Sequence, residues 1–333
     1  MRLNIFGKAR GTRLLPVVVA GLIAASASSH AATPTYTPGT LEAGLCDEAC
    51  LNGLIDQYLA AVVANDASRL PLRNNVRYTE NGQTLRLDDG LWSTADGAGD
   101  YKLLVADPKG GSVGFIGTLR ESGRKVLITV RLKVDGRKIS EIETLVARST
   151  SMGGPAPNSG LPAADQLHDK PIFREVLTPA QRRPREELIA VANSYFEGLE
   201  QATGRVTPFE PTCTRVENGM QTSGNPNASR PMAKLNCGQQ FDTGFAPFIT
   251  EIRGRRFLAV DEARGLVYTM LSFDHAGKIK SVKMTDGSTM TVPPPFDTPY
   301  SFLMAEVFKV RGGKIAQVEA VLITTPYAMP SGW

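Results

Sequence analysis

The sequence predicts an α+β fold made of two tandem units, each with helices packed on a curved antiparallel sheet. Two observations predict it. The chain repeats itself, and each copy begins with a helix-like spacing of apolar residues and ends in long strand-like runs separated by turn residues. The 333 residues, 42% of them hydrophobic and 21% charged, are enough for two packed cores and are not typical of a disordered chain.

The repeat is seen as identities that recur at fixed spacings along the chain. At a spacing of 137 residues (195 − 58), identities within residues 58–82 are Tyr58 with Tyr195, Pro71 with Pro208, and Glu80-Asn81-Gly82 with Glu217-Asn218-Gly219. Further matches follow at spacings of 154 (261 − 107) and 176 (309 − 133). The second copy therefore carries two insertions, and the Gly- and Pro-containing residues in them, 224–237 and 285–299, predict loops.

These spacings set the predicted domain boundaries. The first unit spans residues 46–148, and the second spans residues 185–326 with the two loop insertions. Residues 149–184 lie between the units and are rich in Gly, Pro, Ser and Ala, which predicts a linker.

Each unit is predicted to open with an amphipathic helix. Apolar residues recur at helical spacing from Leu51 to Val62 in the first copy and from Leu188 to Leu199 in the second. Tyr58 and Tyr195 fall on these apolar stripes. Packing is therefore the favoured role for both, although a tyrosine hydroxyl can also reach a cavity.

A sheet is predicted after each helix. In the first copy, residues 76–79 lead as a strand into the turn sequence that starts at Glu80. Three longer strand-like runs, 113–120, 126–134 and 139–146, are joined by tight turns and predict an antiparallel meander. A helix-led segment folded onto such a sheet is an α+β layer arrangement.

Residues 1–31 are typical of a signal peptide. A start with four basic and no acidic residues precedes the apolar run Leu14–Ala27, and small residues precede a cleavage point after Ala31. A membrane anchor is the alternative, but the run falls short of the ~20 residues that a span needs. We therefore expect a periplasmic or secreted protein with no membrane span after cleavage.

Charge argues against nucleic-acid binding. The whole chain has 37 basic and 33 acidic residues, and removing the four basic residues of the leader leaves 33 of each. A mature chain of zero formal charge offers no electrostatic case for a nucleic-acid partner.

Four cysteines, an even number, favour disulfides in an exported protein. Their spacing favours Cys46–Cys50 and Cys213–Cys237 among the three possible pairings. A metal site is the rival interpretation, but the mature chain offers only His168 and His275 as further ligands. We therefore expect disulfides and no metal.

Several short motifs carry a resemblance to a known family. They are Tyr58-Leu59-Ala60-Ala61-Val62 with Asn65-Asp66, Leu70-Pro71-Leu72, residues 76–82, and the closing Leu132-Lys133-Val134 with Gly136, Lys138, Ile139 and Glu143. About 100 residues of each half resemble the nuclear transport factor 2-like, or SnoaL-like, cone fold. The Thr-Glu-Asn-Gly and Gly90-Leu91-Trp92 sequences are similar to secreted SnoaL-like proteins known only as a domain of unknown function. The second copy lacks a Gly-Leu-Trp counterpart.

The resemblance implies an apolar pocket inside each cone, with a carboxylate after the first strand as a proton-shuttling base. The matching positions are Glu80 and, in the second copy, Glu217. Tyr78 alternates with Glu80 on one face of the strand, so Tyr78 or Tyr58 would donate a hydrogen bond to an oxyanion. Desolvation in the cone would raise the pKa of Glu80 toward neutral pH. The alternative is that Glu80 accepts turn hydrogen bonds and has a structural role.

Other residues are weaker pocket candidates. Glu306 is a lone acid in the apolar run 302–310, which suggests that it points into the second cone. Glu143 and Glu319 match across the copies in the last strand, where alternation could point them inward. The full set of pocket candidates is Trp92, Glu143, Tyr195, Glu217, Glu306 and Glu319. His275 is expected in an exposed turn, and Arg253, Arg255 and Arg256 on a solvated face.

Two functions remain open from the sequence. The sequence has no phosphate loop, dinucleotide fingerprint or His-Glu-x-x-His motif, and the two histidines that follow the predicted leader leave little for a Ser-His-Asp triad. One hypothesis is a cofactor-independent lyase, isomerase or cyclase that uses carboxylate acid–base chemistry on a small organic compound. The alternative is a non-catalytic ligand-binding or protein-assembly module. The resemblance also implies that the two units pair within one chain, as family dimers do.

Overall fold

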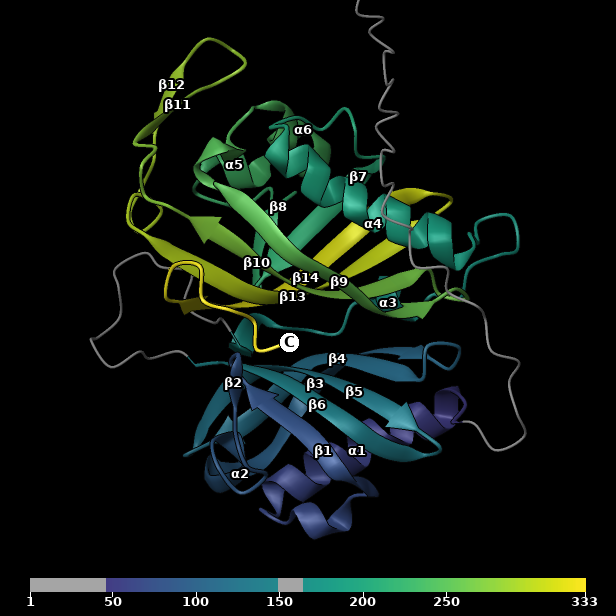
Figure 1. Ribbon diagram of the computed structural model, residues 1–333. Coiled ribbons are helices and arrows are strands. Elements are labelled where there is room, and N and C mark those ends of the chain that lie inside the picture. The colour runs from purple at the N-terminus through teal and green to yellow at the C-terminus, as the bar shows by residue number, and fades with distance from the viewer. Residues whose placement is uncertain (1–45, 149–163) are drawn as a thin grey trace, which may run out of the picture. The chain divides into compact units, whose positions relative to one another are not determined.

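The computed structural model describes residues 46–148 and 164–333, shown in Figure 1. The predicted leader and residues 149–163 of the predicted linker lie outside the described residues. The first unit contains α1 (Glu48–Val63), η1 (Ala67–Arg69), β1 (Leu72–Glu80), β2 (Gln83–Thr84), α2 (Leu91–Thr94), β3 (Ala95–Asp107), β4 (Ser112–Glu121), β5 (Arg124–Asp135) and β6 (Lys138–Ala147).

The second unit repeats this order with additions. After η2 (Ala164–Gln166) and α3 (Pro171–Arg174) come α4 (Arg185–Glu200), β7 (Phe209–Glu217), β8 (Met220–Ser223), α5 (Pro231–Lys234), α6 (Cys237–Asp242), η3 (Ala246–Phe248), β9 (Glu251–Asp261), β10 (Leu266–His275), β11 (Ser281–Lys283), β12 (Thr289–Thr291), β13 (Tyr300–Arg311) and β14 (Lys314–Thr325). The predicted loop insertions in fact contain a short helix, α5, and one strand of the β11–β12 hairpin.

The two sheets have the same topology, and the predicted α+β fold with two units is confirmed. The strand orders are β2-β1-β6-β5-β4-β3 and β8-β7-β14-β13-β10-β9. The predicted meander β4–β5–β6 is antiparallel, but β1 runs parallel to β6, and β7 to β14. This parallel pair arises because the chain crosses from β1 to the far edge at β3 and returns by the meander to lie beside β1.

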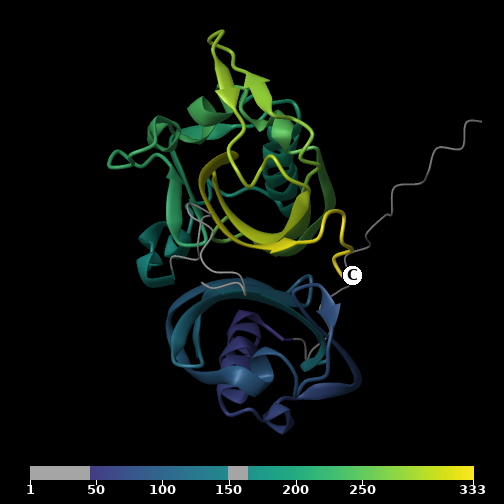
Figure 2. The same cartoon turned by 90° about the vertical axis from the view of Figure 1, so that its left-hand side faces the viewer.

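One helix packs on the concave face of each sheet. Asp47 caps α1 by accepting a hydrogen bond from the backbone N–H of Cys50 (2.9 Å). The predicted apolar stripes of α1 and α4 are buried, including Tyr58 and Tyr195. Figure 2 shows each sheet curling around its helix. Each unit therefore has its own hydrophobic core.

Both predicted disulfides are present. Cys46, just before α1, is bonded to Cys50 in its first turn, and Cys213 of β7 is bonded to Cys237 of α6. Among the described residues, no helix has the length and apolar character to cross a membrane.

A third hydrophobic cluster joins the two sheets on the faces opposite their helices. It includes Leu103 and Ile116 of the first sheet with Met270 and Val307 of the second. Polar contacts cross the same face, among them a hydrogen bond of 2.5 Å between the hydroxyls of Thr129 and Tyr268. Each sheet therefore packs on both faces, one against its own helix and one against the other sheet.

Candidate active site

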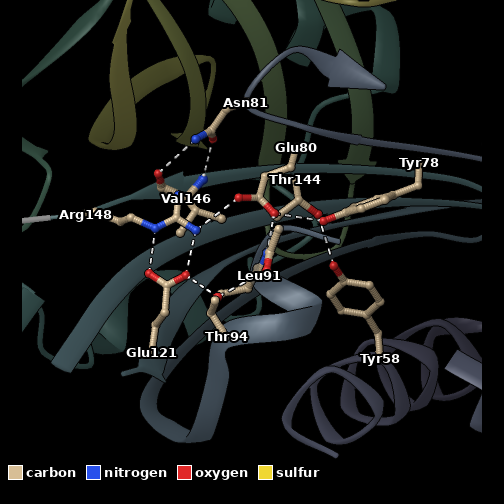
Figure 3. Close-up of polar contacts among 11 residues, drawn as sticks. Tyr58, Tyr78, Glu80, Asn81, Leu91, Thr94, Glu121, Thr144, Val146 and Arg148 are labelled. Carbon is tan, nitrogen blue, oxygen red and sulfur yellow. Dashed lines mark hydrogen bonds and ion pairs between the residues drawn. The ribbon is translucent and has the colours of Figure 1, made fainter. Parts of the chain in front are cut away.

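In the first unit, Glu80 is the centre of a fully connected polar network (Figure 3). Its Oε2 accepts hydrogen bonds from the backbone N–H of Leu91 (2.7 Å) and from the hydroxyl of Tyr78 (3.0 Å). Its Oε1 accepts from Arg148 Nη2 (3.1 Å). Both oxygens of this buried carboxylate are therefore occupied, and one of them holds the start of α2.

Two neighbours explain why this arrangement is rigid. Gly90 precedes α2 with a φ of 63°, and a Cβ there would meet Glu80 Oε2 at 2.4 Å, so only glycine fits. Arg148 also bonds both oxygens of Glu121 (2.6 Å each), which accepts a further bond from Thr94. Burial opposes the charge of Glu121, but the hydrogen bonds from Arg148 and Thr94 lower its pKa.

The first-unit tyrosines also have partners. The Tyr58 hydroxyl lies 3.1 Å from Thr144 Oγ1, and its ring packs edge-on against Trp92 with centroids 5.5 Å apart. Burial raises the pKa of Tyr58 and of Tyr78, so both remain protonated. The structure brings Tyr58, Tyr78 and Glu80 together, and it places Trp92 in the hydrophobic core beneath them.

The second unit contains a carboxylic acid with no hydrogen-bond partner. Glu306 of β13 is 1% exposed, and within the described part of the chain neither of its carboxyl oxygens is hydrogen-bonded. It alternates with Met304 and Phe308 of the second-unit core, so it points into the interior as predicted. Burial raises the pKa of Glu306 to about 8; nearby Glu217 also raises it, and Arg215 lowers it.

Glu306 lies in a row that crosses the sheet. Its strand neighbours are Thr269 of β10 and Ala320 of β14, and Ala320 in turn pairs with Glu217 of β7. Two acids therefore flank an alanine on the concave face. Because neighbouring strands are about 4.8 Å apart, the two glutamate Cα atoms are separated by roughly 10 Å.

Arg215 contacts both Glu217 and side chains inside the second unit. Its Nε lies 3.2 Å from Glu217 Oε1, and its Nη1 donates to the Tyr195 hydroxyl (3.2 Å). A further bond joins Arg215 Nη2 to Gln240 Oε1 of α6. Although burial disfavours the charge of Arg215, Glu217 and Tyr195 raise its pKa above the usual value.

The internal repeat shows how the second-unit site differs from the matching positions of the first unit. Glu217 and Tyr195 match Glu80 and Tyr58, but Arg215 replaces Tyr78 (215 − 137). Glu306 replaces Val130 (306 − 176) and Ala320 replaces Thr144 (320 − 176), and the strand registers agree with both matches. Sequence reasoning overlooked Arg215, although this comparison of the two copies would have found it.

Two pocket candidates lie elsewhere. Glu143 pairs with Arg256 of β9 through two hydrogen bonds, and Glu319 accepts from the Tyr101 hydroxyl (2.5 Å) and pairs with Lys170. Both acids therefore face the other sheet, and the expectation that they point into the cones is wrong. Their neighbours Thr144 and Ala320 take the inward positions, and strand alternation turns Glu143 and Glu319 outward.

His275 and the arginine cluster also differ from the expectation. His275 ends β10 and is 1% exposed, with its ring stacked on Tyr300 (4.5 Å). Burial lowers the pKa of His275 to about 4. Arg253 and Arg256 pair with the buried acids Asp274 and Glu143, and do not form a solvated face.

Residues 110–114 match the serine-nucleophile pattern Gly-x-Ser-x-Gly. Ser112 lies at the start of β4, and its hydroxyl donates to the backbone carbonyl of Leu132. The segment leads into a strand, whereas a nucleophile elbow joins a strand to a helix. Ser112 is therefore not placed as a nucleophile.

Comparison with known proteins gives one family match and distant matches to solved structures. A family model described as a domain of unknown function (DUF8021) matches residues 181–322. No curated protein matches the sequence. A Methylobium petroleophilum PM1 protein of unknown function with a cystatin-like fold is a similar solved structure (15% identity, 42% of this chain, 99% of that chain, TM-score 0.28).

Two further solved structures are similar over part of the chain. One is a Kribbella flavida DSM 17836 protein described as a ketosteroid isomerase (16% identity, 37% of this chain, 90% of that chain, TM-score 0.25). The other is a Rhodopseudomonas palustris protein described as an isomerase (11% identity, 42% of this chain, 91% of that chain, TM-score 0.24).

Proposed function

We propose that the chain is a cofactor-independent isomerase or lyase that moves protons on a small organic compound, and that the second unit carries the chemistry. The observation that supports this most directly is Glu306, a buried acid whose two oxygens have no hydrogen-bond partner among residues 46–148 and 164–333. An unpaired buried polar group costs stability, so it suggests a group kept for a reaction. Glu80 fits a structural role because its oxygens are already occupied.

The two acids of the row would have different catalytic roles. Glu306 is protonated at neutral pH and would act as the acid, and the ion-paired Glu217 would act as the base. Glu306 gives its proton to a carbonyl oxygen of the substrate, while Glu217 removes a proton from the adjacent carbon. The electrons of that C–H bond form the C=C bond of an enol.

The reverse transfers complete the reaction. The enol oxygen returns its proton to Glu306, and Glu217 delivers its proton to a different carbon, which shifts a double bond. If the carbon next to the enol C=C bond bears a leaving group, an elimination results instead: the enol oxygen again returns its proton to Glu306 and the C=O bond re-forms, the electrons of the enol C=C bond form a new C=C bond as the bond to the leaving group breaks, and the group leaves with the proton of Glu217. Atoms and charges balance in both cases without a cofactor.

Tyr195 and Arg215 would hold the reacting groups in place. Since the Tyr195 oxygen accepts a bond from Arg215, its own O–H remains available to donate to a substrate oxygen. Arg215 fixes the position of Glu217. We place the entrance on the Glu217 side, because the side chain of Glu217 is 31% exposed and that of Arg215 is 7% exposed.

The two disulfides support a further part of the proposal, that the protein works in an oxidising compartment outside the cytoplasm, the periplasm or the exterior. The predicted leader agrees with this location.

A ligand screen with matched variants tests the function. Residues 32–333, the chain without its predicted leader, are screened by thermal shift against lactones, phenols and polycyclic ketones, and each hit is followed by mass spectrometry. We expect a hit that the wild type and Glu80→Gln convert but Glu306→Gln only binds. Conversion by Glu306→Gln at the wild-type rate would refute the assignment. Ligands that bind but are never converted would favour the ligand-binding module.

A further inference from the structure

We infer that His275 and Tyr300 form an acid-sensitive lock at the base of an arm made by residues 276–299. The lock holds the arm against the second unit at neutral pH and releases it in acid. The arm connects β10 to β13 and contains the β11–β12 hairpin. Figure 1 and Figure 2 both show the hairpin projecting from the second-unit sheet.

The internal repeat places this pair at the point where the second unit carries its later insertion. His275 and Tyr300 face each other across β10 and β13, just as Glu121 and Arg124 face each other across β4 and β5. In the first unit two residues (124 − 121 − 1) join the pair, whereas in the second unit 24 residues (300 − 275 − 1) join it. An aromatic pair therefore stands in place of a charged pair where the arm begins and ends.

The lock is a cluster of aromatic rings around His275. The His275 ring stacks on Tyr300 with centroids 4.5 Å apart and meets Phe302 edge-on at 5.2 Å. Phe296, near the end of the arm, lies 5.5 Å from it, and Phe248 of η3 lies 6.1 Å from it. One of these rings belongs to the arm itself, so movement of the arm uncovers His275.

This cluster suits a neutral histidine and opposes a charged one. His275 is 1% exposed, and its Nδ1 has no hydrogen-bond partner among residues 46–148 and 164–333. Protonation makes both ring nitrogens donors and places a positive charge among apolar rings. Burial accordingly lowers the pKa of His275 from 6.5 to about 4. Tyr300 stays neutral beside it, because burial raises the pKa of its hydroxyl.

The charged groups around His275 do not compensate a proton on its ring. Asp274 raises the pKa of His275, but burial outweighs it, and the Asp274 carboxylate is already paired with Arg253. On the arm, Asp297 Oδ1 is buried and makes no hydrogen bond to any described residue. The ammonium of Lys280 donates to the backbone carbonyl of Asp297 and adds a positive charge to the arm. A protonated His275 would therefore lack a partner in the closed arm.

The rest of the arm is held by few contacts. Within β11 and β12 only Val282 is buried, in a small cluster with Phe248. Thr285 adds two hydrogen bonds to backbone carbonyls, from its hydroxyl to Asp242 (2.7 Å) and from its N–H to Thr243 (3.1 Å). An element with few buried apolar contacts opens at a low cost in free energy. The arm therefore depends on the aromatic cluster at its base to stay closed.

Acid should shift the arm toward an open state. In the open arm His275 meets water and its pKa returns to 6.5, whereas in the closed arm it is about 4. Because the open state gains a proton that the closed state does not, the closed arm is most stable above pH 6.5 and loses stability as pH falls toward 4. The ratio of open to closed arm should rise roughly 50-fold from pH 7 to pH 4.5.

Hydrogen exchange followed by mass spectrometry tests this on residues 32–333. The wild type is compared with His275→Phe at pH 7 and at pH 4.5, because two proteins at the same pH share the same chemical exchange rate. Phenylalanine keeps an aromatic ring in the cluster and cannot take up a proton. In residues 276–299 the exchange rate of the wild type relative to the variant should rise roughly 50-fold from pH 7 to pH 4.5, while that of α4 should not change.

His168→Gln is the matched control. His168 is exposed and is the only other histidine after the predicted leader, so the arm of this variant should exchange as in the wild type at both pH values. His275→Gln takes the place of the phenylalanine variant if the latter does not fold. The same relative rate at both pH values would overturn the inference. A rise of equal size in α4 would also overturn it, because His275 would then be exposed by unfolding of the whole unit and not by release of the arm.

Discussion

Replacing Glu306 should change how stability depends on pH. The pKa of Glu306 is about 8 in the folded protein and 4.5 for an ordinary glutamate. Between these values the unfolded chain has lost the proton and the folded chain has kept it. The free energy of unfolding of the wild type should therefore fall as pH rises from about 4.5 to about 8, by up to ~1.4 kcal/mol per pH unit.

The total effect is large enough to measure. Over that range this one carboxyl would remove about 4 kcal/mol of stability, and most of the loss would be present at pH 7. Glu306→Gln cannot ionise, so its stability should lack this slope and should exceed that of the wild type at pH 8, even though its buried amide costs about 1–3 kcal/mol. Glu306→Val, which copies Val130 of the first unit, should be more stable still.

The measurement is urea unfolding of residues 32–333 at pH 5, 6, 7 and 8, with wild type, both Glu306 variants and the exposed-site control Glu251→Gln. Other groups contribute to the absolute curves, so the quantity to compare is the difference between each variant and the wild type. If that difference is the same at pH 5 and pH 8, Glu306 is not a buried neutral acid and the assignment of the site fails.

Three further predictions concern the contacts that stabilise the fold. Glu80→Gln should lower the free energy of unfolding by about 2 kcal/mol, since Arg148 loses a charged partner and one oxygen of the network becomes a donor; denaturation that matches the wild type would contradict the structural role. Arg256→Met leaves Glu143, whose side chain is 3% exposed, without its cation, and should lower the free energy of unfolding by about 3 kcal/mol. Adding Glu143→Leu to this variant should recover most of that loss. Losses that simply add in the double variant would argue against the ion pair. Replacing Cys213 and Cys237 by serine opens a bridge between residues 24 apart and should cost about 3.5 kcal/mol, against about 2 kcal/mol for Cys46 and Cys50, which are 4 apart; thermal melts that rank the pairs in the opposite order would refute the entropic reasoning.

Much of the fold was predictable because its signals are local or repeat along the chain. The apolar stripes of α1 and α4, the three-strand meander and the two disulfides all follow from spacing within short segments. The parallel pairing of β1 with β6 was missed, because no local pattern shows which strand a returning chain lies beside. The α5 helix was missed because its Pro- and Gly-rich surroundings indicate loops.

The site was only partly predictable, and the reason is strand alternation. The sequence identified Glu306 as unusual because a lone acid in an apolar run stands out. It could not orient Glu143 and Glu319, since both faces of each sheet are buried and an acid on the wrong face looks the same in the sequence. His275 was misplaced for a related reason: its turn-like neighbours do not reveal the aromatic residues, Phe248 and Phe296, that bury it.

The duplication explains how the chain can tolerate a costly buried acid in one unit. The two sheets share a third hydrophobic cluster, so each unit is stabilised by burial that a single unit would lack. In the first unit, Val130 and Thr144 keep the interior apolar or hydrogen-bonded. In the second, Glu306 and Ala320 occupy the same positions, and together they leave an unpaired acid beside a small side chain. The copies have thus diverged at a few inward positions of a shared framework, which is where a function would be gained without changing the fold.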